Sequence, residues 1–113
     1  MSTEASPLKA QSAAKASDAL LSASALQACL AQLPGWKSSG DVIEKTFSFS
    51  NYHHTMAFVN AVAWLAHEAD HHPDMMVSYN RCTVRWNTHS SGGITLKDAI
   101  CAAQVDDLLC HRA

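Results

Sequence analysis

The sequence predicts an α+β fold in which three helices pack on one face of a four-stranded antiparallel sheet. Apolar residues recur at three- and four-residue steps in three segments, which is typical of helices buried on one side. Between these segments apolar and polar residues alternate, as in half-buried strands. The resulting order is helix, two strands, helix, two strands, helix, and this order favours helices gathered on one face of the sheet.

The first helix and hairpin are expected between residues 21 and 50. In "LSASALQACLAQLPGW" the apolar residues Leu26, Cys29, Leu30 and Leu33 form one stripe, and the Pro-Gly pair after them ends the helix. In "DVIEKTFSFS" the side chains alternate between two faces, which predicts a strand. A preceding strand at residues 36–39, joined through a Gly-Asp turn, would complete a hairpin.

The longest helix is expected at residues 51–70, since this stretch contains neither Gly nor Pro. One stripe along it comprises Met56, Val59, Ala63 and Ala66, and a neighbouring stripe comprises Asn60, Trp64, His67 and His71. Pro73 ends the helix, because the residue before a proline avoids the helical conformation. His72 should therefore be extended, and His71 should lie in the frayed last turn.

The remaining chain is expected to form a second hairpin and a final helix. Residues 75–80 and 81–89 alternate as two strands, so that His89 closes the second strand, and "SSGG" then forms a flexible loop. The final helix spans residues 95–112, with Thr95 as its N-cap and Asp98 at the position that completes a capping box.

The chain of 113 residues is expected to hold one domain, residues 19–113, after an Ala/Ser-rich solvated tail, residues 1–18. The 8 Lys and Arg residues are scattered among 10 Asp and Glu residues, which argues against direct nucleic acid binding. No apolar run is long enough to span a membrane, and the N-terminus lacks a secretory signal pattern. Without a C-x-x-C pair, the four cysteines are expected to be reduced, in a cytoplasmic protein.

The stretch "HEADHHPD", residues 67–74, permits two chemical interpretations. His67, Glu68 and His71 match the H-E-x-x-H pattern of zinc peptidases, whose helix continues past the second histidine. Pro73 forbids that continuation, and a zinc site would leave His72 without a role. A site without metal that uses the histidines as acids and bases is therefore favoured. A zinc site completed by His89, or two solvated loop histidines, are the alternatives.

The wider motif resembles the pterin-4a-carbinolamine dehydratase family. The resemblance rests on "LPGW", on "FSFSNYHHTMAFVNAVAWLAHEADHHPD" and on "YNRCTVRWNTHSSGGIT", and it runs from about Leu21 to Leu109. It implies a four-stranded antiparallel sheet with helices on one side, and it implies no metal and no cofactor. The implied reaction is loss of water from a 4a-hydroxytetrahydropterin to form the quinonoid dihydropterin, which recycles the cofactor of aromatic amino acid hydroxylases.

The same resemblance implies that His71 and His89 transfer protons while His72 binds and orients the pterin. Imidazole suits both acid and base roles at neutral pH. Ser90 and Ser91, in the loop that follows, are further candidates for contacts with the substrate.

Four other candidates each have a functional and a structural interpretation. Asp98 and Tyr79 match the family motif as supporting residues, although Asp98 could equally serve only the capping box. Asp70 could orient His71 and contact the substrate, or it could lie solvated at the helix end. Trp36 could pack on the pterin ring or belong to the core.

A binding function is the alternative to catalysis. Animal members of the family also act as dimerisation cofactors of a homeodomain transcription factor, which would depend on outer residues of the long helix such as Tyr52, Met56 and Val59. A role in another pterin pathway, such as that of molybdopterin, is a third possibility. An edge strand and an apolar helix face predict that the chain forms a homodimer or homotetramer.

Overall fold

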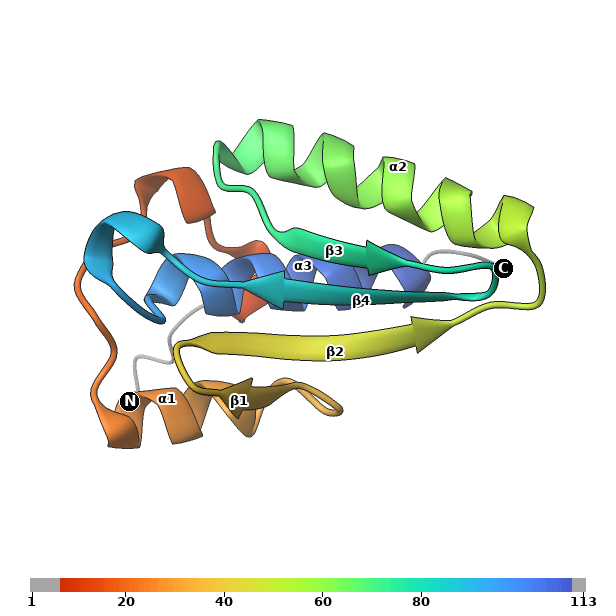
Figure 1. The fold of residues 1–113 in the computed structure, drawn as a ribbon. Coiled ribbons are helices and arrows are strands. Elements are labelled where there is room, and N and C mark those ends of the chain that lie inside the picture. Colours follow the sequence, from red (N-terminus) through yellow and green to blue (C-terminus); the bar gives the residue numbers. More distant parts are fainter. Residues whose placement is uncertain (1–6, 111–113) are drawn as a thin grey trace.

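The computed structural model describes residues 7–110, and its centre is a four-stranded antiparallel sheet in the order β1-β2-β4-β3 (Figure 1). The strands are β1 Lys37–Ser39, β2 Val42–Ser48, β3 Asp74–Val77 and β4 Arg81–Trp86. The α-helices are α1 Ala23–Leu30, α2 Tyr52–Ala69 and α3 Leu96–Cys110, and three short 3₁₀ helices are η1 Leu8–Ala10, η2 Ala13–Lys15 and η3 His89–Ser91. This architecture and element order confirm the predicted α+β fold.

The alternation of side chains along β4 shows which face of the sheet forms the core. In β4 the fully buried side chains of Cys82, Val84 and Trp86 alternate with the partly exposed Thr83 and Arg85. An alternating strand buries every second side chain, so the inward row faces the helices. Helices α2 and α3 contact each other and both contact β4, which closes the core on that face.

The buried face of α2 differs from the stripe of Met56, Val59, Ala63 and Ala66 that the sequence pattern outlines. The buried residues are Thr55, Phe58, Val62, Ala66 and Ala69, whereas Ala63 is exposed and Met56 and Val59 are only partly buried. The sequence pattern is ambiguous because α2 carries alanines on several faces. The aromatic ring of Phe58 decides the orientation by packing against Phe47 and Phe49 of the β2 segment.

Part of the predicted solvated tail packs against α3. Leu8 and Ala13 are buried within the core, and Gln104 donates hydrogen bonds to the backbone carbonyls of Lys9 and Gln11. The expectation of a solvated tail is therefore corrected for residues 7–18, because η1 and η2 contact α3 and bury the apolar side chains of Leu8 and Ala13. Residues 1–6 lie outside the described residues.

The second hairpin is shorter than the sequence predicts. β3 ends at Val77 and β4 ends at Trp86, so His89 does not close a strand. Thr88 instead forms an isolated bridge with Gly93, and His89 begins η3 between them. Within residues 7–110, no helix combines the length and the apolar character that crossing a bilayer requires.

Candidate active site

The end of α2 turns the chain sharply just before the paired histidines. Asp70 adopts a left-handed conformation with φ 50°, its N–H donates to the carbonyl of His67, and the N–H of His71 donates to the carbonyl of Ala66. This pair of bonds is a Schellman motif, which usually has Gly at the left-handed position. His71 therefore lies outside the helix, and not in its last turn as predicted.

The turn directs His71 towards the start of α3. Its Nε2 lies 2.6 Å from Oδ1 of Asp98, and the exposed fraction of the side chain is 12% for His71 and 0% for Asp98. One face of the imidazole stacks on the buried Trp86 ring, with centroids 5.5 Å apart and planes 15° apart. Carboxylate and indole together fix both the direction and the plane of the His71 ring.

Asp98 itself is held by threonine groups on its other oxygen. Oδ2 accepts hydrogen bonds from the backbone N–H of Thr95 at 2.8 Å and from the hydroxyl of Thr88 at 2.9 Å. The bond from Thr95 is the half of a capping box in which the acidic side chain reaches back to the residue before the helix. The two interpretations of Asp98 are thus compatible, because one oxygen caps α3 while the other contacts His71.

A small cavity opens beside this pair, with a volume of about 250 Å³. The lining residues come from the end of α2, the segment after β4 and the start of η3: Asp70, His71, His72, Asn87, Thr88, His89 and Ser90. His72 and His89 are both exposed there, whereas His71 is mostly covered. The structure thus brings together all three histidines singled out in the sequence.

Asp70 does not orient His71. The carboxylate bonded to His71 belongs to Asp98, while Asp70 is exposed at the helix end. Its left-handed backbone places it on the rim of the cavity, so a contact between Asp70 and substrate stays a prediction.

Trp36 and Tyr79 lie away from the cavity in this chain. The Trp36 indole is buried against Phe47, and its N–H donates to the carboxylate of Asp106, two helical turns beyond Asp98. Tyr79 is 64% exposed at the turn between β3 and β4, where its ring stacks on Tyr52. Of the two interpretations of Trp36, the structure thus favours the core, and it gives Tyr79 no contact with the histidines.

The two serines after His89 separate in the structure. Ser90 lines the cavity, whereas the Ser91 hydroxyl donates to the backbone carbonyl of Asp18 at 2.5 Å. The Asp18 carboxylate also pairs with Lys97 on α3 at 2.9 Å. Ser91 therefore ties the turn that carries His89 to the segment before α1, and it does not line the cavity.

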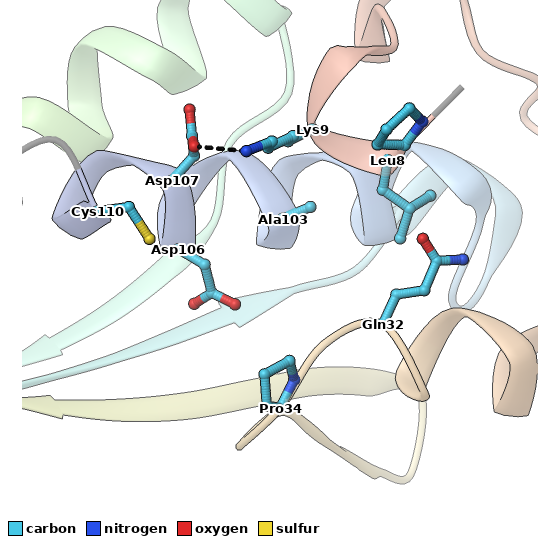
Figure 2. A pocket seen from close by; sticks show the side chains of 9 residues that line it. Leu8, Lys9, Gln32, Pro34, Ala103, Asp106, Asp107 and Cys110 are labelled. Carbon is cyan, nitrogen blue, oxygen red and sulfur yellow. Dashed lines mark hydrogen bonds and ion pairs between the residues drawn. The ribbon is translucent and has the colours of Figure 1, made fainter.

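A second hollow of similar size lies between the N-terminal segment and α3 (Figure 2). Figure 2 shows Lys9 bridged to Asp107 above it, with Gln32 and Pro34 on the opposite side. The neighbouring Asp106 carboxylate accepts hydrogen bonds from Trp36 and Lys45. Because its acidic groups are already paired and it has no histidine, this hollow lacks the acid–base character of the first cavity.

The H-E-x-x-H arrangement is not formed as a helical pair of metal ligands. His67 is exposed on α2 with its ring against Trp64, while His71 lies past the helix and contacts Asp98. Among residues 7–110, no three His, Cys, Asp or Glu side chains are grouped as a metal site would need.

The buried surroundings of Asp98 also affect a neighbouring thiol. Burial, and after it the negative charge of Asp98, raise the pKa of Cys101 to about 12. Cys101 lies one helical turn further along α3 and is fully buried. The thiol is thus kept protonated and inert, which suits a structural residue behind the site.

Sequence reasoning missed Thr88, although the quoted motif contains it. The signal was the alternation of β4: Cys82, Val84 and Trp86 point inward, and Thr88 continues the same row beyond the end of the strand. A polar residue on an inward row needs a buried partner, and the partner is Asp98.

The comparisons with known proteins agree with this geometry. The family model described as Pterin 4 alpha carbinolamine dehydratase matches residues 19–108. A relative from Nitrosomonas eutropha, provisionally named pterin-4-alpha-carbinolamine dehydratase, is 60% identical over 75 residues, which is 66% of each chain. A relative from Stenotrophomonas maltophilia with the same provisional name is 50% identical over 96 residues, or 83% of each chain.

Solved structures extend the likeness to the fold. A transcriptional coactivator/pterin dehydratase from Brucella melitensis superimposes with a TM-score of 0.76 at 30% identity, covering 79% of this chain and 97% of its own. A pterin dehydratase-like protein, identified as a RuBisCO assembly factor in the alpha-carboxysome, has a TM-score of 0.54 at 26% identity, covering 65% and 84%. The chain therefore belongs to the pterin-4-alpha-carbinolamine dehydratase family.

Proposed function

We propose that this chain removes water from 4a-hydroxytetrahydropterin to give the quinonoid dihydropterin, and so recycles the cofactor of aromatic amino acid hydroxylases. The observation that carries the proposal is the convergence of His71, His72 and His89 on one cavity, with a buried carboxylate behind the first of them. The N5–H and C4a–O bonds break, and a C4a=N5 double bond forms. One proton leaves and one is supplied, so the reaction needs no redox cofactor.

His71 is suited to take the proton from N5. Its ring contacts a fully buried carboxylate at 2.6 Å, and such a pair stabilises the imidazolium that forms when the ring accepts a proton. The Trp86 ring limits rotation of the imidazole, so its free edge keeps one direction. His71 is thus the proposed general base.

His89 is the proposed general acid for the departing hydroxyl. His89 lines the cavity from η3, whereas His71 lines it from the turn after α2. The side chain of His89 is exposed. A proton donor and a proton acceptor on separate segments can approach a flat ring from different sides. His72, with Asp70 and Ser90 on the rim, would then bind and orient the pterin.

A binding function is the second candidate, since one similar structure is that of a transcriptional coactivator/pterin dehydratase and another is that of a RuBisCO assembly factor. The outer face of α2 offers the surface for it, because Tyr52 is 53% exposed and Trp64 is 65% exposed.

We further propose that the chain is cytoplasmic and that it self-associates. The contact would use exposed apolar surface, including Met76 of the edge strand β3. Light scattering that shows a monomer at micromolar concentration would exclude this self-association.

Steady-state kinetics of the three histidine variants test the proposed roles. His71→Ala and His89→Ala should each lower kcat by about 10² to 10⁴, whereas His72→Ala should chiefly raise KM. The two proton-transfer variants should also discriminate more strongly between the 4a-R and 4a-S substrates. If all three variants raise KM and leave kcat intact, the histidines only bind and the acid–base assignment is wrong.

A further inference from the structure

Two buried threonine hydroxyls lie behind the Asp98 carboxylate, on the side away from His71. Thr88 is 5% exposed and Thr95 is fully buried, and their hydroxyl oxygens lie 2.8 Å apart. Thr88 comes from the segment after β4 and Thr95 from the residue before α3. The pair thus joins one of the segments that line the cavity to the start of α3, which carries Asp98.

The donors and acceptors in this cluster can be assigned by counting protons. The backbone N–H of Thr95 can only donate, and at 2.8 Å it donates to Oδ2 of Asp98. The Thr88 hydroxyl, with its single proton, donates to the same oxygen at 2.9 Å. Its own oxygen then accepts the proton of the Thr95 hydroxyl, which is nearer to Thr88 at 2.8 Å than to Asp98 at 3.4 Å.

This chain of bonds fixes what the other carboxylate oxygen does. With Oδ2 held by two donors, the carboxylate cannot rotate without breaking a buried hydrogen bond, so Oδ1 stays directed at His71. A carboxylate oxygen accepts, so Nε2 of His71 must carry a proton. In the neutral ring the other nitrogen, Nδ1, is then the one without a proton.

We infer that Thr88 is a positioning residue that acts through Asp98 to hold the proton of His71 on Nε2, so that Nδ1 accepts the proton from N5 of the pterin. The inference rests on the proposed function for its last step only. The tautomer and its dependence on Thr88 concern the protein without substrate.

Substitutions at Thr88 separate positioning from packing. Thr88→Val keeps the size and removes the hydroxyl, and it should lower kcat roughly 10- to 100-fold, as expected for one lost hydrogen bond to a charged group. KM should change by less than about threefold: Thr88 lines the cavity, but its hydroxyl donates its proton to Asp98 and not to the substrate. Thr88→Ser restores the hydroxyl and should recover most of kcat.

The matched control is Thr83→Val. Thr83 also pairs with a threonine, Thr46, at 2.7 Å, but on the face of the sheet away from the helices. It should leave kcat unchanged. If Thr83→Val lowers kcat as much as Thr88→Val does, or if Thr88→Ser fails to recover activity, Thr88 has only a structural role and the inference is wrong.

Nuclear magnetic resonance of the ring nitrogens gives a readout that does not depend on activity. In the substrate-free wild type, at a pH where the ring is neutral, His71 should show a protonated Nε2 and an unprotonated Nδ1, assigned by loss of its signals in His71→Gln. The Nε2 proton should exchange slowly with water, and faster in Thr88→Val but not in Thr88→Ser. A proton on Nδ1 in the wild type would overturn the inference. The expected tautomer in a protein without dehydratase activity would support the positioning and refute the proposed function alone.

Discussion

Replacing Asp98 by Asn exchanges one acceptor oxygen for a donor amide while keeping the size of the side chain. The backbone N–H of Thr95 can only donate, so the remaining oxygen of the new residue must stay at the Oδ2 position. The amide group then faces His71 Nε2, where the wild type has an oxygen at 2.6 Å. The amide donates, so Nε2 must accept, and the proton of the neutral ring moves to Nδ1.

The expected loss follows from this reversal. Nδ1 would no longer be free to accept the N5 proton, and the negative charge that stabilises the imidazolium would be gone. We expect kcat to fall by about 10² to 10⁴, or about 3 to 5 kcal/mol of transition-state stabilisation, the range for a lost general base. KM should stay within a few-fold, because Asp98 is fully buried and absent from the cavity lining.

The assay is the absorbance change as freshly generated 4a-hydroxytetrahydropterin is dehydrated, with circular dichroism to verify folding. Asp106→Asn is the matched control, since this carboxylate lies on the same helix but is paired with Trp36 and Lys45 away from the cavity. A folded Asp98→Asn variant that keeps kcat within threefold of the wild type would refute the reasoning, as would an equal loss in Asp106→Asn.

Three further predictions concern the surroundings of the site. Asp70 has φ 50°, so Asp70→Gly should keep or raise the free energy of unfolding while Asp70→Val should lower it by about 1 to 2 kcal/mol, and equal effects in urea denaturation would contradict the strain. Ser91→Ala removes the bond to Asp18 and should lower kcat several-fold by loosening His89, whereas an unchanged kcat would show that this bond does not serve catalysis. Because burial and then the charge of Asp98 raise the pKa of Cys101 from 9.0 to about 12, the unfolded chain loses this proton first as pH rises, so the free energy of unfolding should decline above pH 9. Urea titrations at several pH values should show that the free energy of unfolding falls more steeply with pH in the wild type than in Cys101→Ala. The difference in slope should reach up to about 1.4 kcal/mol per pH unit, and parallel slopes would contradict this.

The elements that local rules control were predictable from the sequence. Alternation in β4 and the end of α2 before Pro73 depend on neighbouring residues alone, and the structure follows both, although α2 already ends at Ala69. The rotation of α2 was not predictable, because its alanines fit several faces and the contact of Phe58 with Phe47 decides between them. Phe58 and Phe47 belong to different elements, so their contact forms only when the chain folds and no local pattern reveals it.

The candidate site was likewise predictable only in part. Motif and spacing identified the three histidines, which the fold brings to one cavity. The carboxylate partner of His71 could not be chosen from the sequence, because Asp70 is adjacent in the chain while Asp98 is adjacent in space. The left-handed turn at Asp70 makes this choice by pointing the two neighbouring side chains in different directions.

The most direct test of the central claim is the decay rate of 4a-hydroxytetrahydropterin with the wild type, with His71→Ala/His89→Ala and with buffer alone. We expect fast, saturable dehydration by the wild type without added metal or cofactor, and a rate near that of buffer for the folded double variant. A wild type that is no faster than buffer, or a double variant as fast as the wild type, would contradict the claim that these histidines carry out the dehydration.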